Sequence, residues 1–340
     1  MDESKPNFSR RHFLAGTSAV AAGALVPGGS RRQTEAAAPG DKQALIAITL
    51  DLEMSMHYPT WDMMEWNYEK GNLTSAVKQY TVEAGRRVKA KGGILQCFLL
   101  GRVLEQENVD WLKELVREGH AVGNHTYDHV SVWATSPEQL QYRFQRAPWL
   151  IRGKTVPEVI RENILLTEAA METRIGVKPL GFRTPGGSTE GLKGRPDIQK
   201  LLLDLGFTWA SSMAPGVPVT PANPTDADFQ AVADAQASSQ PFVYPTGLIE
   251  IPMSPLGDVA SFRREKEKWK LGDFLKMVEH NVRWAIDHGG VFDLLTHPSI
   301  MVVEDPEFRA YELICDLVGA SSGRARIVGL DEIAKRHQVK

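Results

Sequence analysis

Short apolar runs alternate with amphipathic stretches from residue 44 onward, and this alternation restricts the possible folds more than any other feature of the sequence. The run ALIAITLDLE (44–53) is almost continuously apolar before its first carboxylate, as expected of a strand that is buried on both faces. A helical pattern from about Thr74 to Lys91 follows and ends at two glycines. Repetition of this order predicts parallel strands that are joined by helical crossovers.

The predicted strands number about eight, and most of them have a helix between them. They are ALIAITLDLE, ILQCFLL, HAVGNH, PLGFRTP, FTWASS, LIEIPMS, VFDLLTH and ARIVGL. Residues 214–241, which are rich in Pro, Ala and Asp, are predicted to be a loop. So many strands in one α/β domain favour a closed or nearly closed barrel over an open doubly wound sheet. The glycine-rich phosphate-binding fingerprint is also missing after the first strand.

The start of the chain has a pattern typical of export signals. Arg10 and Arg11 precede a mildly apolar run over residues 13–26, and small residues suited to cleavage come next. The pattern predicts a twin-arginine export signal and flexible leader over residues 1–40, with a catalytic barrel over 41–340. The apolar run has about 14 residues, fewer than the roughly 20 that span a bilayer. We therefore expect a periplasmic or extracellular protein without stable membrane insertion after cleavage; a disordered tail or an uncleaved anchor is the alternative.

Charge and cysteine content narrow the range of partners. The net charge is −3 and the sequence has no long basic run, which argues against nucleic acid as a partner. The two cysteines, Cys97 and Cys315, lie in apolar stretches and are predicted to be core residues rather than metal ligands. The sequence is compatible with either a monomer or an oligomer.

Two histidines, His125 and His129, stand four positions apart in GHAVGNHTYDHV. In a helical turn such side chains lie roughly 5–6 Å apart, whereas in a strand they would be about 13 Å apart. If the chain curls after Gly123 and Asn124, both imidazoles can reach one metal ion. A surface helical turn that carries two histidines is the other interpretation, because the spacing by itself is a weak motif.

Polar residues gather at the ends of four predicted strands, the edge at which (β/α) barrels carry their chemistry. Asp51 and Glu53 end the first strand and, being two residues apart, point to the same side. The third strand ends at the histidine pair, a later one at Arg183, and VFDLLTHP at His297. This recurrence at one edge favours a metal-dependent active site over a chance scatter of polar residues.

The order of TLDLE, GHAVGNHTYDH, GFRTPGG, LGFTWASS and LLTHP resembles that of the polysaccharide deacetylase family with its NodB homology domain (carbohydrate esterase family 4), over nearly all of residues 44–335. GNHTYDH resembles the family's H-[ST]-x-x-H metal motif. The resemblance implies a single distorted, incomplete (β/α) barrel, with Zn²⁺ or another divalent transition metal bound by His125 and His129. It also implies an exported hydrolase of carbon–nitrogen bonds other than peptide bonds. Such an enzyme would remove acetyl groups from an N-acetylated (or O-acetylated) polysaccharide by attack of a metal-bound water.

The resemblance further implies a role for each residue at the strand ends. The family's first motif commonly reads T-F-D-D, but Leu52 replaces the second aspartate here. Glu53 is therefore predicted to be the third metal ligand and Asp51 the general base, and an exchange of these two roles is the alternative. Arg183 would keep Asp51 ionised and oriented, and His297 would protonate the leaving group.

Further substrate-binding residues are predicted around this site. Pro185 and Gly186 at the end of FRTPGG are predicted to bind substrate, and the resemblance implies that a backbone N–H near Gly186 holds the oxyanion. Tyr58, Trp61 and Trp66 lie in an unusually long connection after the first strand. Their aromatic faces would stack on sugar rings, or else would pack this connection onto the barrel or an oligomer partner.

A second departure from the family pattern concerns the support of His297. Relatives often carry an aspartate near Ala210, and Glu250 is predicted to stand in for it, whereas Asp293 lies too far along its own strand. Two alternatives to a deacetylase remain. The chain also resembles allantoinase-like hydrolases of small cyclic amides, which share the altered first motif. Leu52 and Ala210 would also suit a catalytically inactive glycan-binding protein.

Overall fold

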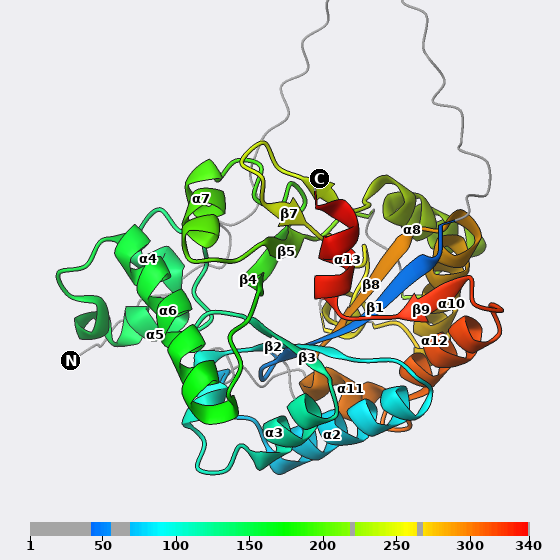
Figure 1. Cartoon of the computed structure of the whole chain (residues 1–340), viewed down its shortest axis with the longest axis horizontal. Helices are drawn as coiled ribbons and strands as arrows, with labels where there is room; N and C mark the ends of the chain where they lie inside the picture. Colours follow the sequence, from blue (N-terminus) through cyan, green and yellow to red (C-terminus); the bar gives the residue numbers. More distant parts are fainter. Residues whose placement is uncertain (1–41, 56–68, 218–221, 264–267, 339–340) are drawn as a thin grey trace, which may run out of the picture. The chain divides into compact units, whose positions relative to one another are not determined.

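The fold is a curled, mostly parallel sheet, and the computed structural model describes it over residues 42–55, 69–217, 222–263 and 268–338. The sheet has nine strands in the order β6-β7-β5-β4-β3-β2-β1-β8, with β9 also paired to β1 (Figure 1). Neighbouring strands are parallel except for β6 and β7, which are antiparallel. Helices separate most of the strands along the chain, so the predicted α/β class is confirmed.

The elements have the following bounds. The strands are β1 (Ala44–Leu52), β2 (Gln96–Leu99), β3 (Ala121–Asn124), β4 (Gly181–Ser188), β5 (Trp209–Met213), β6 (Phe242–Val243), β7 (Ile249–Glu250), β8 (Val291–Thr296) and β9 (Ala325–Ile327). The α-helices are α2 (Ser75–Ala90), α3 (Asp110–Arg117), α4 (Pro137–Leu140), α5 (Tyr142–Arg146), α6 (Val156–Ile175), α7 (Pro196–Asp204), α8 (Asp226–Ser238), α9 (Asp258–Phe262), α10 (Leu271–His288), α11 (Pro298–Glu304), α12 (Arg309–Gly319) and α13 (Leu330–His337). Two short 3₁₀ helices are η1 (Gly101–Glu105) and η2 (Pro148–Ile151).

Strand β1 is paired along both of its edges. On one edge its first residues, Ala44–Ile46, pair with β9, and its last residues, Thr49–Leu52, pair with β2. On the other edge Leu45–Leu50 pairs with β8. All of its side chains are buried, which explains why its sequence is almost continuously apolar.

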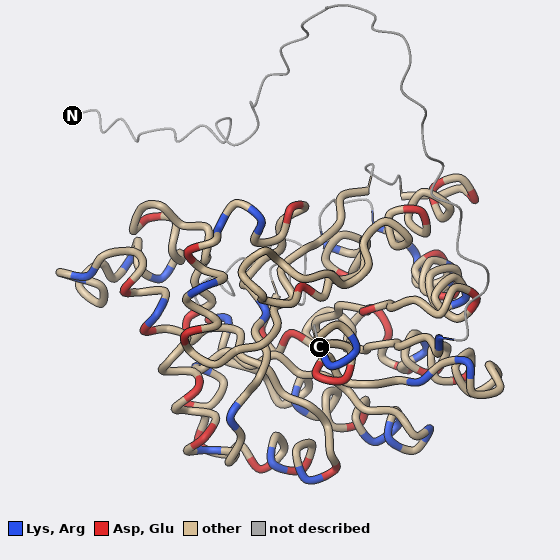
Figure 2. Tube along the Cα trace, turned by 45° about the horizontal axis from the view of Figure 1, so that its top comes forward, with Lys and Arg blue, Asp and Glu red and all other residues tan. Residues whose placement is uncertain are grey.

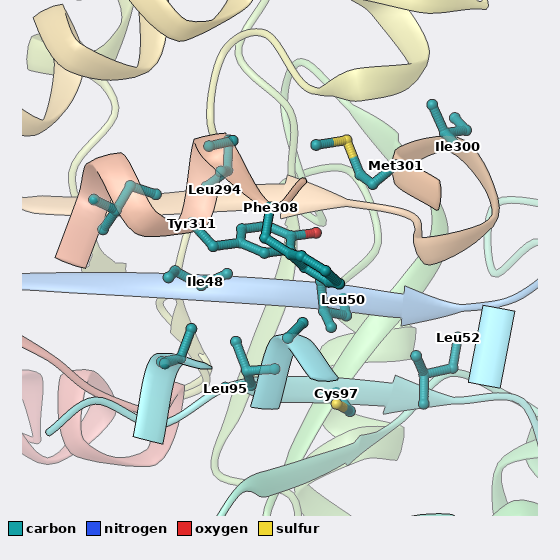
Figure 3. Packing of buried hydrophobic residues seen from close by; sticks show 14 of the residues in the cluster. Ile48, Leu50, Leu52, Leu95, Cys97, Leu294, Ile300, Met301, Phe308 and Tyr311 are labelled. Atoms are coloured by element: carbon teal, nitrogen blue, oxygen red, sulfur yellow. The ribbon is translucent and has the colours of Figure 1, made fainter. Parts of the chain in front are cut away.

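The two faces of β1 have different surroundings because alternate side chains point to opposite sides of a strand. Ile48, Leu50 and Leu52 belong to the large core that the sheet forms with its covering helices, which Figure 3 shows around β1. Leu45 and Ala47 belong instead to a separate apolar cluster inside the curl. The outward-facing side chains of β1 therefore pack against the covering helices. Its inward-facing side chains beyond Leu45 and Ala47 can line the interior of the barrel.

The C-terminal helix α13 closes one end of the curl. Leu330 and Ile333 pack with Leu45 and Trp209 in the inner apolar cluster, and α13 lies between β1 and β5 in Figure 1. The indole Nε1 of Trp209 also donates a hydrogen bond to Asp331 Oδ1 at 2.7 Å. Because Leu45 stands at the start of β1, this helix covers the N-terminal ends of the parallel strands. We call it the α13 plug.

The two edges of the sheet approach each other beyond β7. The backbone N–H of Ser254 donates to the carbonyl oxygen of Asp293 in β8 at 2.7 Å, and the Ser254 hydroxyl accepts from the N–H of Leu295 at 3.3 Å. The edges are thus bridged by a few bonds rather than by a continuous ladder. The prediction of a single distorted, incomplete (β/α) barrel is confirmed.

The prediction that residues 214–241 form a loop is wrong over residues 226–238, which form helix α8. Thr225 and Asp228 form a capping box in which each side chain accepts a hydrogen bond from the other residue's backbone N–H. Phe229 and Val232 then bury the inner side of the helix in the large core. The Pro and Asp content of the segment concealed this start signal.

Charge is spread evenly over the described part of the chain, and Figure 2 shows acidic and basic residues interspersed along the trace. Cys97 and Cys315 are buried, as predicted for core residues, and both are free thiols. Among the helices of the described residues, none combines the length and the apolar character that crossing a bilayer requires. The predicted export signal lies outside the described ranges and stays a prediction.

Candidate metal centre

A layer of paired polar groups lies on the inner face of the barrel, beyond the inner apolar cluster. The fully buried Arg183 of β4 donates to Thr49 Oγ1 at 2.8 Å and to Asp293 Oδ2 at 2.7 Å. It also donates to Asp51 Oδ1 at 3.1 Å, and its guanidinium carbon lies 4.2 Å from the ring centroid of Phe98. The contacts with both carboxylates and the aromatic ring fix the guanidinium, and through it the side chain of Asp51.

Asp293 completes this layer, a placement that the sequence pattern did not predict. Burial raises the pKa of Asp293 to about 6, although Arg183 and the hydroxyl of Thr49 favour its charged form. The expectation that Asp293 cannot support His297 agrees with this placement, because its carboxylate is turned toward Arg183. A buried arginine that faces Asp51 needs further anions, and this requirement was the available signal.

The two histidines follow β3 in a tight curl of the backbone. Thr126 and His129 adopt left-handed conformations, with φ of 62° and 61°. The side chain of Asn124 accepts from the N–H of Thr126 at 2.9 Å, and the Thr126 hydroxyl accepts from the N–H of Val130 at 3.0 Å. As a result the rings of His125 and His129 lie 5.1 Å apart between centroids, as the predicted curl requires. Left-handed non-glycine residues are costly and typically occur at functional sites.

Three side chains converge at the open end of the barrel. Ligand atoms of Glu53, His125 and His129 all lie within 4.8 Å of one another, the geometry of a candidate metal site. Glu53 Oε2 is 2.9 Å from His129 Nε2 and 3.7 Å from His125 Nε2. Asp51 lies at the edge of this group, with Oδ2 3.7 Å from His125 Nε2. The geometry therefore favours Glu53 over Asp51 as the third ligand.

The donor atoms of this group suit a divalent transition metal. The Nδ1–H of His125 donates to the carbonyl oxygen of Arg183 at 2.9 Å, which leaves the lone pair of Nε2 free. Among the described residues, His125 Nε2 and Glu53 Oε2 are buried atoms without a hydrogen-bond partner. Unpartnered buried polar atoms are costly, and two that face one point are what a bound cation would satisfy. Two imidazoles and one carboxylate match the ligand set of catalytic zinc sites.

The charge states of these groups are set by burial and by neighbouring ions. Burial lowers the pKa of His129 to about 4, against the opposing effect of Glu53, so the ring is neutral and able to ligate at neutral pH. Burial alone would raise the pKa of Glu53, but His129 and the ammonium of Lys70 hold it well below its usual range. Lys70 Nζ lies 2.6 Å from Glu53 Oε1.

His297 faces the same site from the end of β8. Its Nε2 lies 4.0 Å from Asp51 Oδ2 and 3.7 Å from Glu53 Oε1. Its Nδ1–H donates to Asp258 Oδ1 at 3.0 Å, at the start of α9. Burial would lower the pKa of His297, but the carboxylates of Asp258, Asp51 and Glu53 raise it to about 9. The ring is therefore protonated at neutral pH, with one N–H directed at Asp258 and the other toward the site.

The prediction that Glu250 supports His297 is wrong, and Asp258 occupies that position. Glu250 accepts hydrogen bonds from Ser212 and from Tyr244, whose hydroxyl lies 2.8 Å away. In the sheet register Glu250 pairs with Ala210, and Ala210 packs in the apolar cluster outside the barrel. An acidic residue at either position would therefore point away from His297.

A cavity of about 500 Å³ opens over these groups. Asp51, Glu53, His129, His297 and Gly186 are among the residues that line it. The apolar residues of its lining include Val217, Met253, Leu256, Val259, Ala260 and Leu295.

Not all of the predicted substrate-binding residues line this cavity. Gly186 has a left-handed φ of 74°, and its carbonyl oxygen accepts from the Thr184 hydroxyl at 2.8 Å. Pro185 is buried and is not among the lining residues. Tyr58, Trp61 and Trp66 lie outside the described residues.

Comparison of the sequence with protein families identifies residues 67–208 as matching polysaccharide deacetylase. The matched segment contains the histidine pair and Arg183, whereas Asp51, Glu53 and His297 fall outside it. The expected resemblance is therefore confirmed over the segment that carries the most specific motif. A comparison with curated proteins finds no match.

Solved structures with the same fold cover most of this chain. A proposed polysaccharide deacetylase from Mycobacterium smegmatis is 18% identical, with a TM-score of 0.57, over 88% of this chain and 91% of its own. One from Pseudomonas aeruginosa PAO1 is 14% identical, with a TM-score of 0.59, over 87% and 91%. The allantoinase PuuE is 16% identical, with a TM-score of 0.57, over 87% and 91%. At these identities the likeness concerns the fold.

Proposed function

With residues 67–208 identified as belonging to the polysaccharide deacetylase family, we propose that this protein is a metal-dependent hydrolase that removes acetyl groups from an N-acetylated or O-acetylated glycan. One observation carries the proposal: a metal-ligand group, a carboxylate and a protonated histidine face one cavity. Hydrolysis of an acyl bond by a metal-activated water uses these three functions within reach of one carbonyl.

The proposed ligands are Glu53, His125 and His129. A divalent cation held there, Zn²⁺ or another transition metal, would polarise an acyl carbonyl and make water a stronger nucleophile. The sequence departure at Leu52 does not remove a ligand, because Glu53 supplies the carboxylate from the following position. This substitution of one acid for another argues against a catalytically inactive glycan-binding protein.

Asp51 is the proposed general base. Arg183 holds its Oδ1, whereas its Oδ2 faces His125 and His297 and is available to a water molecule in the cavity. Asp51 would take a proton from water as the oxygen attacks the acetyl carbonyl. Arg183 is itself held by Asp293, so the base is oriented by a buried chain of charge-assisted bonds.

His297 is the proposed general acid. Its ring is protonated at neutral pH and directs one nitrogen toward the site, while Asp258 fixes the other. When the tetrahedral intermediate collapses, His297 would pass a proton to the departing amine or hydroxyl, which releases acetate. Backbone N–H groups near Gly186, which lines the cavity, would hold the oxyanion.

A hydrolase of small cyclic amides is a second candidate, and the shape of the cavity favours it. A volume of about 500 Å³ with several apolar lining residues is typical of small-molecule sites. The fold shared with an allantoinase is compatible with this activity but does not argue for it. Both candidates would use the same base and acid.

The decisive experiment compares acyl release by the wild type and by His129→Ala. The purified protein is assayed for bound metal, then for acetate release from a panel of N- and O-acetylated glycans, with small cyclic amides in parallel. We expect acetate release that is lost in His129→Ala and after chelation, and that returns in the wild type when Zn²⁺ is added. Full activity after complete removal of metal would contradict the proposal, and turnover of cyclic amides alone would favour the second candidate.

We propose further that the protein is exported through the leader over residues 1–40. The paired arginines Arg10 and Arg11 support this proposal, because they are typical of signals for the twin-arginine route, which exports proteins already folded. Fusion of residues 1–40 to a reporter that is active only after export as a folded protein tests it, with Arg10→Lys and Arg11→Lys together as the control. Export that is unaffected by this double change would contradict the proposal.

A further inference from the structure

Lys70 is a cation at the metal centre that neither the sequence motifs nor the proposed reaction accounts for. It lines the cavity, and its ammonium lies 2.6 Å from Glu53 Oε1. We propose that Lys70 is a positioning residue that reserves one oxygen of Glu53 and leaves only the other for the metal. This inference rests on the proposed metal site.

The main chain holds Lys70 beside Glu53. The N–H of Met54, the residue after Glu53, donates to the carbonyl oxygen of Lys70 at 2.8 Å. Gly71 packs so closely against Arg102 that a Cβ at position 71 would lie 2.4 Å from the Cβ of Arg102. The side chain of Lys70 is only 16% exposed, so its ammonium is directed into the cavity rather than into bulk water.

The two oxygens of Glu53 consequently have different surroundings. Oε1 contacts the Lys70 ammonium, whereas Oε2 faces the two ligand histidines and has no hydrogen-bond partner. The two oxygens of Asp51 also have different surroundings. Oδ1 accepts a hydrogen bond from Arg183, and Oδ2 faces His125. Each carboxylate thus has one oxygen in direct contact with a cation, Lys70 for Glu53 and Arg183 for Asp51. His297 Nε2 lies farther away, 3.7 Å from Glu53 Oε1 and 4.0 Å from Asp51 Oδ2.

This division matters because a catalytic metal needs coordination positions that the protein does not fill. A free glutamate can offer both of its oxygens to one cation, and the second oxygen would occupy a position needed by substrate. Groups that hydrogen-bond to metal ligands fix the way in which those ligands bind. Lys70 has the charge and the placement to hold Oε1 in this way.

The test measures metal coordination without any substrate. Wild type, Lys70→Met, Lys70→Arg and the surface control Lys91→Met, whose ammonium pairs with the exposed Asp316, are loaded with Co²⁺. Four-coordinate Co²⁺ absorbs visible light much more strongly than six-coordinate Co²⁺, so the band intensity reports how many ligands bind. Thermal unfolding of each variant checks that the fold is retained.

We expect Lys70→Met to keep its Co²⁺ but to lose about half or more of the visible absorption, because Glu53 then adds a second oxygen. Lys70→Arg and Lys91→Met should keep the wild-type spectrum. An unchanged spectrum in Lys70→Met would overturn the inference. Loss of Co²⁺ from a folded Lys70→Met protein would also overturn it. Lys70 would then be required for metal binding itself, not for limiting Glu53 to one metal-binding oxygen.

Kinetics on any substrate found for the wild type provide a second readout. In Lys70→Met we expect kcat to fall about 10- to 100-fold with KM within about twofold. A raised KM with an unchanged kcat would overturn the inference and assign Lys70 to substrate binding. If the wild type binds no metal, the proposed function fails before the variants are compared. If it binds metal but turns over no acyl substrate, the Co²⁺ spectra still decide the role of Lys70.

Discussion

Asp258 accepts two hydrogen bonds from His297, one from its backbone N–H and one from its Nδ1–H at 3.0 Å, across 39 positions of the chain. The contact fixes both the rotation of the ring and the nitrogen that carries the proton toward the site. It also contributes, with Asp51 and Glu53, to a pKa of about 9 for His297, against the opposing effect of burial.

The pH dependence of activity should therefore change in Asp258→Asn. A general acid must be protonated, so activity falls as the pH rises above its pKa. In the wild type we expect kcat/KM to fall on its alkaline side as His297 loses its proton, and Asp258 is one of the carboxylates that raise the pKa of this ring. Removal of the Asp258 charge lowers the pKa of His297, so the alkaline limb should move to lower pH. Glu250→Gln is the matched control. Glu250 does not contact His297, so this change should leave the alkaline limb of the pH profile at its wild-type position.

The same contact predicts a pH-dependent stability in the metal-free protein. The folded pKa of His297 is about 9, above the unfolded value of 6.5. Its stabilisation is therefore fully present below pH 6.5 and is lost as the pH rises to 9. The loss amounts to about 3 kcal/mol for a shift of this size. Denaturant unfolding at both pH values should show a smaller difference in Asp258→Asn, and an equal difference in the two proteins would contradict this account.

Asp293→Asn tests the buried charge layer under the site. The change leaves the fully buried Arg183 without the carboxylate at 2.7 Å, and breaking such a pair costs about 3–5 kcal/mol. The free energy of unfolding should fall by this amount. Glu279→Gln removes the partner of Arg283 in an exposed pair and should cost less than about 1 kcal/mol. If the two changes lowered the free energy of unfolding equally, burial would not determine the cost of removing a charged partner.

Gly181→Ala tests the packing beneath Arg183. A Cβ at position 181 would lie 1.8 Å from Cζ2 of Trp209, so the indole would have to move, and with it the bond to Asp331. Overpacking of this kind costs about 1–3 kcal/mol. Gly194→Ala has open space around it and should change the stability by no more than about 0.5 kcal/mol. Thermal unfolding of both variants gives the comparison.

Metal addition should stabilise the wild type and not His129→Ala. A ligand that binds only the folded state stabilises it by about 2.7 kcal/mol at a free concentration 100 times its Kd. Titration of Zn²⁺ into the metal-free proteins, followed by thermal unfolding, measures this effect. An equally large rise in the unfolding temperature of His129→Ala would show that the ion binds at another site.

The residues at the strand ends could be predicted because parallel strands bring their C-terminal ends to one edge. Asp51, Glu53 and Arg183 converge with the histidine loop for this reason, and one carboxylate spacing of two residues was enough to place both acids on one face. The proximity of His125 and His129 could be predicted because a turn after the strand brings residues four positions apart close together.

Asp258 and Lys70 could not be predicted in the same way. Asp258 lies at the start of a short helix, and Lys70 in the connection before α2, where no periodic pattern fixes the direction of a side chain. Their roles depend on contacts with residues far along the chain or across a loop. Sequence spacing does not report such contacts.

The misplacement of Glu250 has a simpler cause. Ile249 and Ile251 face the inside of the barrel, so Glu250 between them must face outward. Ala210 lies opposite Glu250 in the register and faces the same way. The alternation of apolar residues in LIEIP already contained this information.

The pairing of β1 with β8 and β9 has a consequence for the order in which the protein matures during translation. Thr49 and Asp293 are hydrogen-bonded at a separation of 244 positions, so β1 has no partner on that edge until the ribosome has made most of the chain. A nascent chain that ends before β8 leaves one edge of β1 bare and prone to pairing with other chains. Asp51 and Asp293 share Arg183, so the proposed base reaches its final surroundings only after β8 has been made.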